Sequence, residues 1–197
     1  MIDAYPGIIE MQTMMVIEQQ RAEDKTAIEA LLDVTFGRDR QQKAAYRLRE
    51  GVSPVAGLSF VMLDGDELVG TLRFWPVKIA NSTIRHNGLS SVGSDVSSPE
   101  DTVSALLLGP IAIKPELQGQ GHGLALMAHG LKVARQNGHR IVLLVGDEAY
   151  YQKVGFSREL AKNIILPAVE DKNRFLAQEL VPGSLHDIAG TVQADHS

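Results

Sequence analysis

The sequence predicts an α/β (α+β) domain with a mixed, partly parallel, twisted sheet flanked by helices. Three observations support this class. Apolar runs of strand length alternate with segments of helical periodicity. The turn Asp64-Gly65-Asp66 between two apolar runs is typical of an antiparallel hairpin. The order strand, helix, strand over residues 105–145 is typical of a right-handed crossover between parallel strands.

The composition is that of an ordinary globular chain. Its 197 residues fit one domain, and 44% of them are hydrophobic, which is enough for a full core. The net charge of −5 argues against nucleic acid as a partner, because phosphate binding requires a surplus of Lys and Arg. The chain has no cysteine, which excludes disulfides and a cysteine nucleophile. It has no apolar run of about 18 residues and no signal-peptide pattern at its start, so we expect a cytoplasmic protein without a membrane span.

The first 80 residues predict three strands and two helices. Asp24 is a suitable N-cap, and Ile28, Leu31 and Leu32 follow it at helical spacing. A second, very polar helix follows between two glycines. The predicted elements are a strand at 16–20, helices at 25–36 and 38–49, and strands at 58–63 and 68–79. Residues 80–104 are polar and rich in Ser, Asn and Gly, so we expect mostly loop there.

The second half of the chain predicts a buried strand, a long helix and another buried strand. Residues 105–114 are almost wholly apolar, and Pro115 ends this run because the residue before a proline avoids the helical region. The helix at 124–136 has an apolar stripe made by Leu124, Met127, Ala128, Leu131 and Ala134. Further predicted elements are a strand at 140–145, a short helix at 148–154, and strands at 163–166 and 174–180. We therefore expect a leader at 1–15, one domain at 16–180 and a C-terminal tail at 181–197.

A glycine-rich turn precedes the long helix, with the sequence Gln118-Gly119-Gln120-Gly121-His122-Gly123. Glycines allow close approach of a ligand, and successive backbone N–H groups at a helix start suit a phosphate or pyrophosphate. The turn lacks the Gly-Lys-Ser/Thr of a P-loop, and Leu124 stands where the dinucleotide loop Gly-x-Gly-x-x-Gly requires its third glycine. It does match a third pattern, Gln/Arg-x-x-Gly-x-Gly/Ala, at Gln118, Gly121 and Gly123. A plain tight connection is the alternative interpretation.

This third pattern is the signature of the GCN5-related N-acetyltransferases, which the chain resembles over residues 16–180. The strand that ends in Ile111-Ala112-Ile113-Lys114-Pro115 resembles the family's fourth strand, and Tyr151 to Phe156 resembles its recurring Tyr-x-x-x-Gly-Phe. The run Gly146 to Tyr151 is similar to that of the YhbS-like group of predicted bacterial acetyltransferases. The resemblance implies an acyl-CoA N-acyltransferase fold, in which the sheet is splayed at its centre between the fourth and fifth strands.

The resemblance also implies a reaction and a site. An acetyl group moves from acetyl-CoA to a primary amine by direct attack, and Tyr151 protonates the leaving thiolate as general acid. No metal is implied, because no cluster of His, Asp and Glu in the sequence has ligand spacing. The pyrophosphate binds the N–H groups of the glycine-rich turn, and the pantetheine arm lies along the fourth strand like an added strand. Backbone N–H groups near Ile111 and Ala112 stabilise the oxyanion. The cofactor-binding residues so implied are Ile111, Ala112, Ile113, Gln118, Gly119, Gln120, Gly121, His122, Gly123 and Leu124.

The general base and the acceptor stay open at this stage. The strand at 105–113 has no acidic residue, and Asp147, Glu148, Asp95 and His86 are candidates by residue type alone. A water chain or an amine that arrives neutral is the alternative. The acceptor is expected to be a small molecule, with a protein or peptide amine, or a non-catalytic acyl-CoA-binding module, as alternatives. The resemblance assigns the acceptor groove to residues 24–49 and 58–79, and it leaves a homodimer open.

Overall fold

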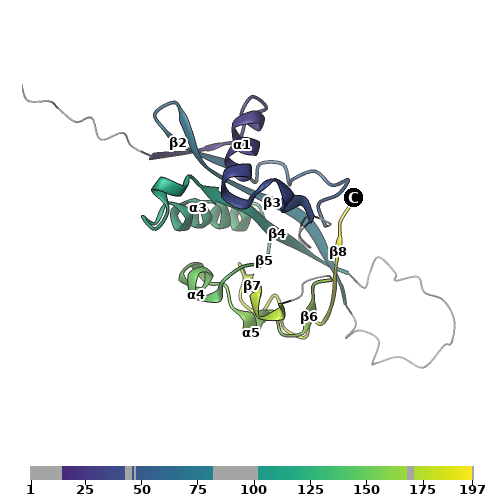
Figure 1. Cartoon of the computed structure of the whole chain (residues 1–197). Coiled ribbons are helices and arrows are strands. Elements are labelled where there is room, and N and C mark those ends of the chain that lie inside the picture. Colours follow the sequence, from purple (N-terminus) through teal and green to yellow (C-terminus); the bar gives the residue numbers. More distant parts are fainter. Residues whose placement is uncertain (1–14, 43–45, 47, 82–101, 168–170, 197) are drawn as a thin grey trace, which may run out of the picture.

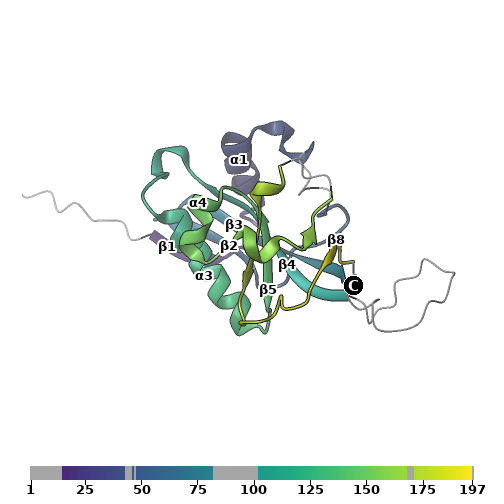
Figure 2. The ribbon, with the colours of Figure 1, turned by 90° about the horizontal axis from the view of Figure 1, so that it is seen from below.

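The computed structural model describes residues 15–42, 46, 48–81, 102–167 and 171–196. In this part of the chain, one mixed sheet contains the strands, and helices lie on both of its faces (Figures 1 and 2). The mixed, partly parallel sheet that the sequence predicts is therefore confirmed.

The strands follow the order β1-β2-β3-β4-β5-β7 across the sheet, and β8 pairs with β3 and β6 beside this path. Antiparallel pairing joins β1 through β4 in chain order, whereas β4 and β5 are parallel. The strand bounds are β1 Met15–Gln19, β2 Ser59–Asp64, β3 Glu67–Asn81, β4 Thr102–Ile113, β5 Ile141–Val145, β6 Ile164–Ile165, β7 Phe175–Glu179 and β8 Gly190–Ala194.

The two long helices, α1 Lys25–Phe36 and α3 His122–Gln136, cover opposite faces of the sheet (Figure 2). The core clusters show this division, because Leu108 of β4 packs with residues of α3 and Ala112 packs with residues of α1. The shorter helices are η1 Arg38–Gln42, η4 Pro115–Leu117, α4 Glu148–Tyr151, η5 Gln152–Val154, α5 Arg158–Ala161 and η6 Lys172–Arg174.

Two segments differ from the sequence expectation. The expected tail at 181–197 contains β8, which pairs with β3 and so adds a strand to the sheet. The sequence signal for this strand is weak, because β8 is short and mostly polar and Val192 is its buried apolar side chain. The polar helix expected at 38–49 begins as a 3-10 helix, η1. Residues 43–45 and 47, the expected leader up to residue 14, and the loop at 82–101 lie outside the described residues.

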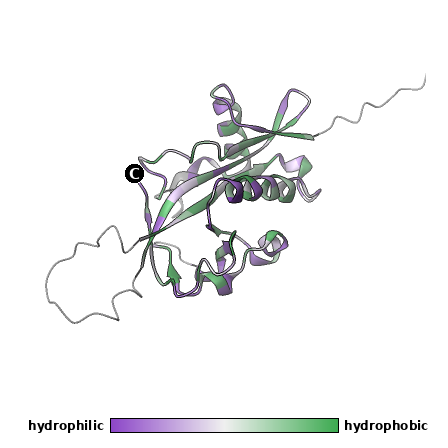
Figure 3. Cartoon of the chain, turned by 180° about the vertical axis from the view of Figure 1, so that it is seen from behind, coloured by the Kyte–Doolittle hydropathy of each residue, from purple (hydrophilic) through white to green (hydrophobic). Residues whose placement is uncertain are grey.

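The buried stripe of α3 is rotated slightly from the predicted one. Ala128 is exposed, whereas Leu126 and Gly130 are buried against the sheet. Figure 3 shows hydrophilic and hydrophobic residues alternating around this helix. Gly130 lies at the closest contact, because a Cβ built there would be 2.8 Å from Leu72 Cδ2 and 2.8 Å from Phe74 Cε2. The missing side chain allows α3 to pack directly on β3.

Replacing Gly130 with alanine should therefore destabilise the protein. In an exposed helix interior this change stabilises by about 0.5–1 kcal/mol, because glycine is the poorer helix former. Here the new methyl group overpacks the core against two fully buried side chains, which costs about 1–3 kcal/mol. Urea unfolding of Gly130→Ala and of the control Ala128→Gly measures both effects on one helix. A gain in stability for Gly130→Ala would contradict the tight contact.

Candidate active site

The strands β4 and β5 are adjacent at one end and diverge toward the other. In the described part of the chain, β4 and β5 pair at two positions, Leu106 with Val142 and Leu107 with Leu143. Both strands continue beyond these pairs, β4 to Ile113 and β5 to Val145. The sheet therefore opens beyond the second pair. The splay that the resemblance implies is confirmed.

A β-bulge in β4 lies where this opening begins. The register between β3 and β4 shifts so that Gly109 and Pro110 of β4 together oppose Arg73 of β3. The indole Nε1 of Trp75 donates a hydrogen bond of 2.6 Å to the carbonyl of Gly109. Bulges bend a strand and change the direction of the residues that follow. The bulge is thus held from the face that α1 covers, and β4 bends there.

The edge of β4 that faces the opening presents the backbone of Ile111 and Ile113. The N–H of Lys114 donates to the carbonyl of Val69 on β3 at 2.8 Å. In an antiparallel pair, successive residues direct their N–H groups alternately toward and away from the partner strand. Ala112 therefore directs its N–H toward β3, and its two neighbours direct theirs into the opening. The N–H of Ala112 is thus turned toward β3 and away from the opening, whereas the N–H of Ile111, beside the bulge, faces the opening.

The glycine-rich turn follows the open end of β4 directly. Gly119 and Gly121 have left-handed φ angles of 78° and 89°. No described atom lies within 4 Å of a Cβ built at either glycine, so this face of the turn is open. The first backbone hydrogen bond of α3 runs from Ala125 to the carbonyl of Gly121. The N–H groups of the three residues before Ala125 therefore lack an acceptor within the helix and are suited to an anionic group.

The two glutamine side chains of the turn bond to the protein itself. Gln118 Nε2 donates to the carbonyl of Ile113 at 3.0 Å, and Gln120 Nε2 donates to the carbonyl of Glu116 at 3.2 Å. These bonds hold the turn against the end of β4. A ligand at the turn would therefore contact Gln118 and Gln120 through their backbone groups.

The motif Tyr-x-x-x-Gly-Phe places a tyrosine over the end of β5. Gly155 has a φ of 95°, which reverses the chain so that Phe156 enters the core with 1% of its surface exposed. The rings of Tyr151 and Phe156 meet edge to face, with centroids 6.2 Å apart. A Cβ built on Gly146 would lie 2.0 Å from Tyr151 Cε2, so the ring lies directly on the residue that follows β5. Burial raises the pKa of Tyr151 to about 12, which keeps its hydroxyl protonated at neutral pH.

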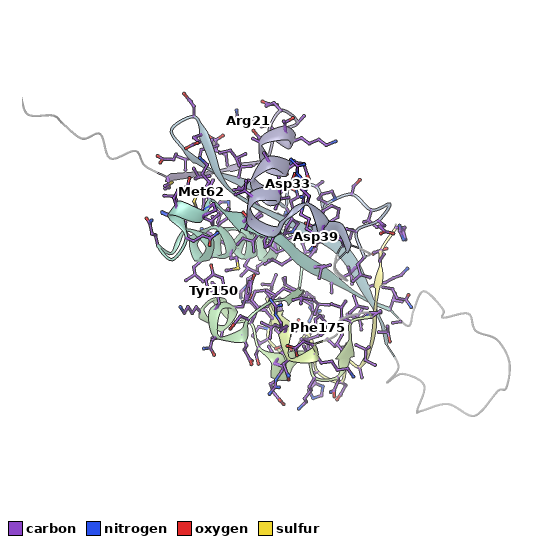
Figure 4. All side chains as sticks on the ribbon, in the orientation of Figure 1. Arg21, Asp33, Asp39, Met62, Tyr150 and Phe175 are labelled. Atoms are coloured by element: carbon purple, nitrogen blue, oxygen red, sulfur yellow. The ribbon has the colours of Figure 1, made fainter. Side chains whose placement is uncertain are left out.

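Tyr150 points in a different direction from its neighbour. Its hydroxyl lies 2.5 Å from where a Cβ of Gly123 would be, so the side chain reaches the first turn of α3. Figure 4 labels Tyr150 on α4, beneath α3. The rings of Tyr150 and Tyr151 meet edge to face at 5.1 Å. The contact between Tyr150 and the turn was missed in the sequence, because only the fold brings α4 to α3.

The candidate bases have structural partners where they are described. Asp147 caps α4, because its Oδ1 accepts from the N–H of Ala149 at 2.8 Å. Glu148 Oε1 accepts from the N–H of Arg158 at 2.8 Å. Asp95 and His86 lie outside the described residues.

A cavity of about 240 Å³ lies on the α1 side of the β4 bulge. Its walls include the charged residues Arg40 and Arg73, within the segments that the resemblance assigns to the acceptor groove. Tyr46, Arg49 and Trp75 also contribute, and sequence reasoning missed them. The alternation of Arg73 and Trp75 around buried Phe74 was an available signal, since alternate residues share one face of a strand. The complete lining is Glu29, Leu32, Arg40, Tyr46, Arg49, Glu50, Arg73, Trp75 and Pro110.

Two absences hold for the described part of the chain. No group of three or more His, Cys, Asp or Glu side chains there is arranged to hold a metal ion. No described helix is both long enough and apolar enough to cross a membrane.

A splayed parallel strand pair, an open glycine-rich turn at a helix start and a partly buried tyrosine beside the splay define an acyltransferase of the acyl-CoA-dependent type. The chain belongs to the acetyltransferase (GNAT) family, whose model matches residues 25–156. The resemblance and the enzyme class that the sequence predicts are therefore confirmed.

Several relatives match this chain over nearly its whole length. The chain is 24% identical to the uncharacterized N-acetyltransferase YhbS of Escherichia coli strain K12 over 179 residues, which is 91% of this chain and 95% of that protein. The crystal structure of Escherichia coli YhbS in complex with CoA matches with a TM-score of 0.71 at 21% identity, covering 98% of this chain and 94% of that one. A GNAT family acetyltransferase from Brucella melitensis in complex with acetyl-CoA has a TM-score of 0.61 at 22% identity, covering 93% and 97%. At these identities the structural match establishes the fold.

Proposed function

We propose that this chain transfers an acetyl group from acetyl-CoA to a primary amine of a small-molecule acceptor. The observation that carries this proposal is the opening between β4 and β5, which the glycine-rich turn borders on one side and Tyr151 on the other. Relatives with the same fold bind CoA or acetyl-CoA, which supports the same cosubstrate here.

The cosubstrate would lie along the open edge of β4. Its pyrophosphate accepts hydrogen bonds from the N–H groups at the start of α3, near Gly121 and Gly123. Its pantetheine arm pairs with the backbone of Ile111 and Ile113, as an added strand does. This position brings the thioester to the bulge, between the acceptor cavity and Tyr151.

The reaction is a direct attack of the amine nitrogen on the thioester carbon. The carbonyl oxygen becomes an oxyanion, which the N–H of Ile111 stabilises. Collapse of this intermediate breaks the carbon–sulfur bond, and Tyr151 donates its proton to the departing thiolate. The amine also loses a proton, which Glu50 accepts as the carboxylate of the cavity wall that has no arginine partner among the described residues. Alignment of the two reactants supplies most of the rate enhancement.

The size of the cavity favours a small acceptor. A space of about 240 Å³ is close to the lower end of small-molecule sites, which occupy roughly 300–1,000 Å³. A panel of small amines and lysine-containing peptides, assayed for acetyl-CoA-dependent thiol release, distinguishes the two kinds of acceptor. Turnover of peptides alone would favour a protein acetyltransferase, and absence of any turnover would favour a non-catalytic acyl-CoA-binding module.

Acetyl-CoA should raise the melting temperature of the protein. A ligand that binds only the folded state at a concentration 100 times its Kd stabilises it by about 2.7 kcal/mol. NADH and ATP should give smaller shifts, because the turn lacks the patterns of the dinucleotide loop and the P-loop. Differential scanning fluorimetry with the three ligands makes this comparison. A larger shift with NADH than with acetyl-CoA would contradict the proposed cosubstrate.

A further inference from the structure

Five charged residues line the cavity beside the β4 bulge. Arg40, Arg49 and Arg73 are positive, and Glu29 and Glu50 are negative. A buried cation requires an anion or hydrogen-bond acceptors, because removing it from water is costly. The partners of each arginine therefore show where the protein itself neutralises the charge.

Two of the three arginines have carboxylate partners within the chain. Arg40 is 4% exposed and forms ion pairs with Glu29 and with Asp33 of α1, which Figure 4 labels. Arg73 Nε donates to Gln20 Oε1 at 2.8 Å, and its Nη1 lies 3.7 Å from Glu29 Oε1. Glu29 thus interacts with two guanidinium groups, and its single negative charge is already balanced within the protein.

Arg49 differs from the other two in having no carboxylate partner among the described residues, although the buried Nε of Arg40 also lacks a hydrogen-bond partner there. Its Nε and Nη1 are buried and have no hydrogen-bond partner among the described residues, and the same is true of the Tyr46 hydroxyl. The guanidinium lies over the rings of Tyr46 and Trp75, 4.7 Å and 5.6 Å from their centroids. These rings hold the group in position, but they do not accept the hydrogen bonds of its N–H groups. Burial lowers the pKa of Arg49 to about 10, and its contact with the Tyr46 side chain offsets only part of this shift.

The guanidinium of Arg49 lies next to the expected position of the thioester. A Cβ built on Gly109 would be 3.2 Å from Arg49 Nη2, which places this nitrogen against the bulge. The bulge marks the start of the opening between β4 and β5. A ligand bound to Arg49 from the cavity would therefore have its other end close to the carbonyl that is to be attacked.

We infer that Arg49 binds a carboxylate of the acceptor, so that the acceptor is a small amine that also carries a carboxylate, as amino acids do. A guanidinium matches a carboxylate with two parallel hydrogen bonds, and the Tyr46 hydroxyl is a further donor in the same cavity. Leu32 and Pro110 provide apolar wall for the rest of such a molecule. This inference rests on the proposed function and specifies its acceptor class.

Matched pairs of acceptors test this inference. Leucine, methionine and phenylalanine are compared with their amides, which keep the amine and the side chain and lack the carboxylate charge. We expect the parent to prefer the amino acids by about 10–100-fold in kcat/KM, the range of a charge-assisted hydrogen bond. Arg49→Gln should abolish this preference, mainly through KM, and Arg49→Lys should restore part of it. Arg38→Gln makes the same change in net charge at a side chain that is 94% exposed, and it should keep the preference.

A second measurement does not depend on turnover. With CoA present, N-acetyl-leucine should raise the melting temperature of the parent more than its amide does, and Arg49→Gln should lose this difference while keeping its shift with CoA alone. If these shifts are observed but no acceptor is turned over, the result supports the anion site at Arg49 and contradicts the proposed acetyl transfer. Equal rates and equal shifts for acids and amides in the parent would overturn the inference. An undiminished preference for the amino acids in Arg49→Gln would also overturn the inference. The melting-temperature shift with CoA reports whether each variant is folded.

Discussion

Replacing Tyr151 with phenylalanine is expected to lower kcat by about 10²–10⁴-fold, with the affinity for acetyl-CoA near that of the parent. The change removes the hydroxyl and retains the ring that packs on Gly146 and Phe156. The loss then reports the proton that the departing thiolate no longer receives. Because the thiolate of CoA is a fair leaving group by itself, we expect a value toward the low end of this range. Steady-state kinetics and a thermal shift with acetyl-CoA measure the two quantities separately.

Tyr150→Phe is the matched control for this experiment. The two tyrosines are adjacent on α4, yet the hydroxyl of Tyr150 lies against Gly123 rather than over the end of β5. Its removal should lower kcat less and could alter the affinity for the cosubstrate. Equal rates for the parent and Tyr151→Phe would remove the acid role, and a larger loss of kcat for Tyr150→Phe would transfer that role to Tyr150.

The pH profile gives an independent measure of the same role. A general acid must be protonated, so the rate falls as the pH rises through its pKa. Burial raises the pKa of Tyr151 from 10.0 to about 12, and this moves the descending limb upward. The kcat of the parent should therefore stay level through about pH 10, where an ordinary tyrosine is half ionised. A descending limb below that pH would contradict Tyr151 as the acid.

Gly121→Glu is expected to abolish binding of acetyl-CoA while the protein remains folded. The new side chain would occupy the open face of the turn, and its negative charge would repel the pyrophosphate. Gly121 also has a φ of 89°, so any other residue there is strained by about 1–2 kcal/mol. The thermal shift that acetyl-CoA produces in the parent should be lost in this variant.

Gly138→Glu separates the loss of binding from the backbone strain. Gly138 has a φ of 86°, and no described atom lies within 4 Å of a Cβ built there, as at Gly121. It follows the far end of α3, about 22 Å away at 1.5 Å per residue of a 15-residue helix. Both variants should lose similar stability, and Gly138→Glu should keep the full shift with acetyl-CoA. A full shift in Gly121→Glu would mean that the phosphates bind elsewhere.

Local sequence was sufficient for the elements whose signal is contiguous. A glycine-rich turn is a run of neighbouring backbone groups, so the pattern at Gln118, Gly121 and Gly123 predicts a phosphate-binding turn without knowledge of the fold. The hairpin at Asp64 to Asp66 and the crossover through α3 are local for the same reason. The strand β8 within the tail at 181–197 had no such local signal, because it is mostly polar and pairs with a distant part of the chain.

The direction of the backbone groups in β4 could not be read from strand alternation. A regular strand would direct the side chains of Leu108 and Ile111 to opposite faces, since successive residues alternate. The bulge at Gly109 and Pro110 adds one residue, and both side chains pack against the core under α3. This extra residue also sets which N–H groups face the opening, so Ile111 qualifies as a donor and Ala112 does not.

The sequence by itself determined the mixed fold, the glycine-rich turn and the tyrosine motif, because each depends on the spacing of residues that are near neighbours in the chain. Only the tertiary structure decided the divergence of β4 from β5, the contact of Tyr150 with α3 and the lack of a carboxylate partner for Arg49 among the described residues. These features depend on contacts between elements that are far apart in the sequence. An arginine at position 49 looks like any surface cation until the packing shows that Arg40 and Arg73 have carboxylate partners and that the guanidinium of Arg49 has none among the described residues.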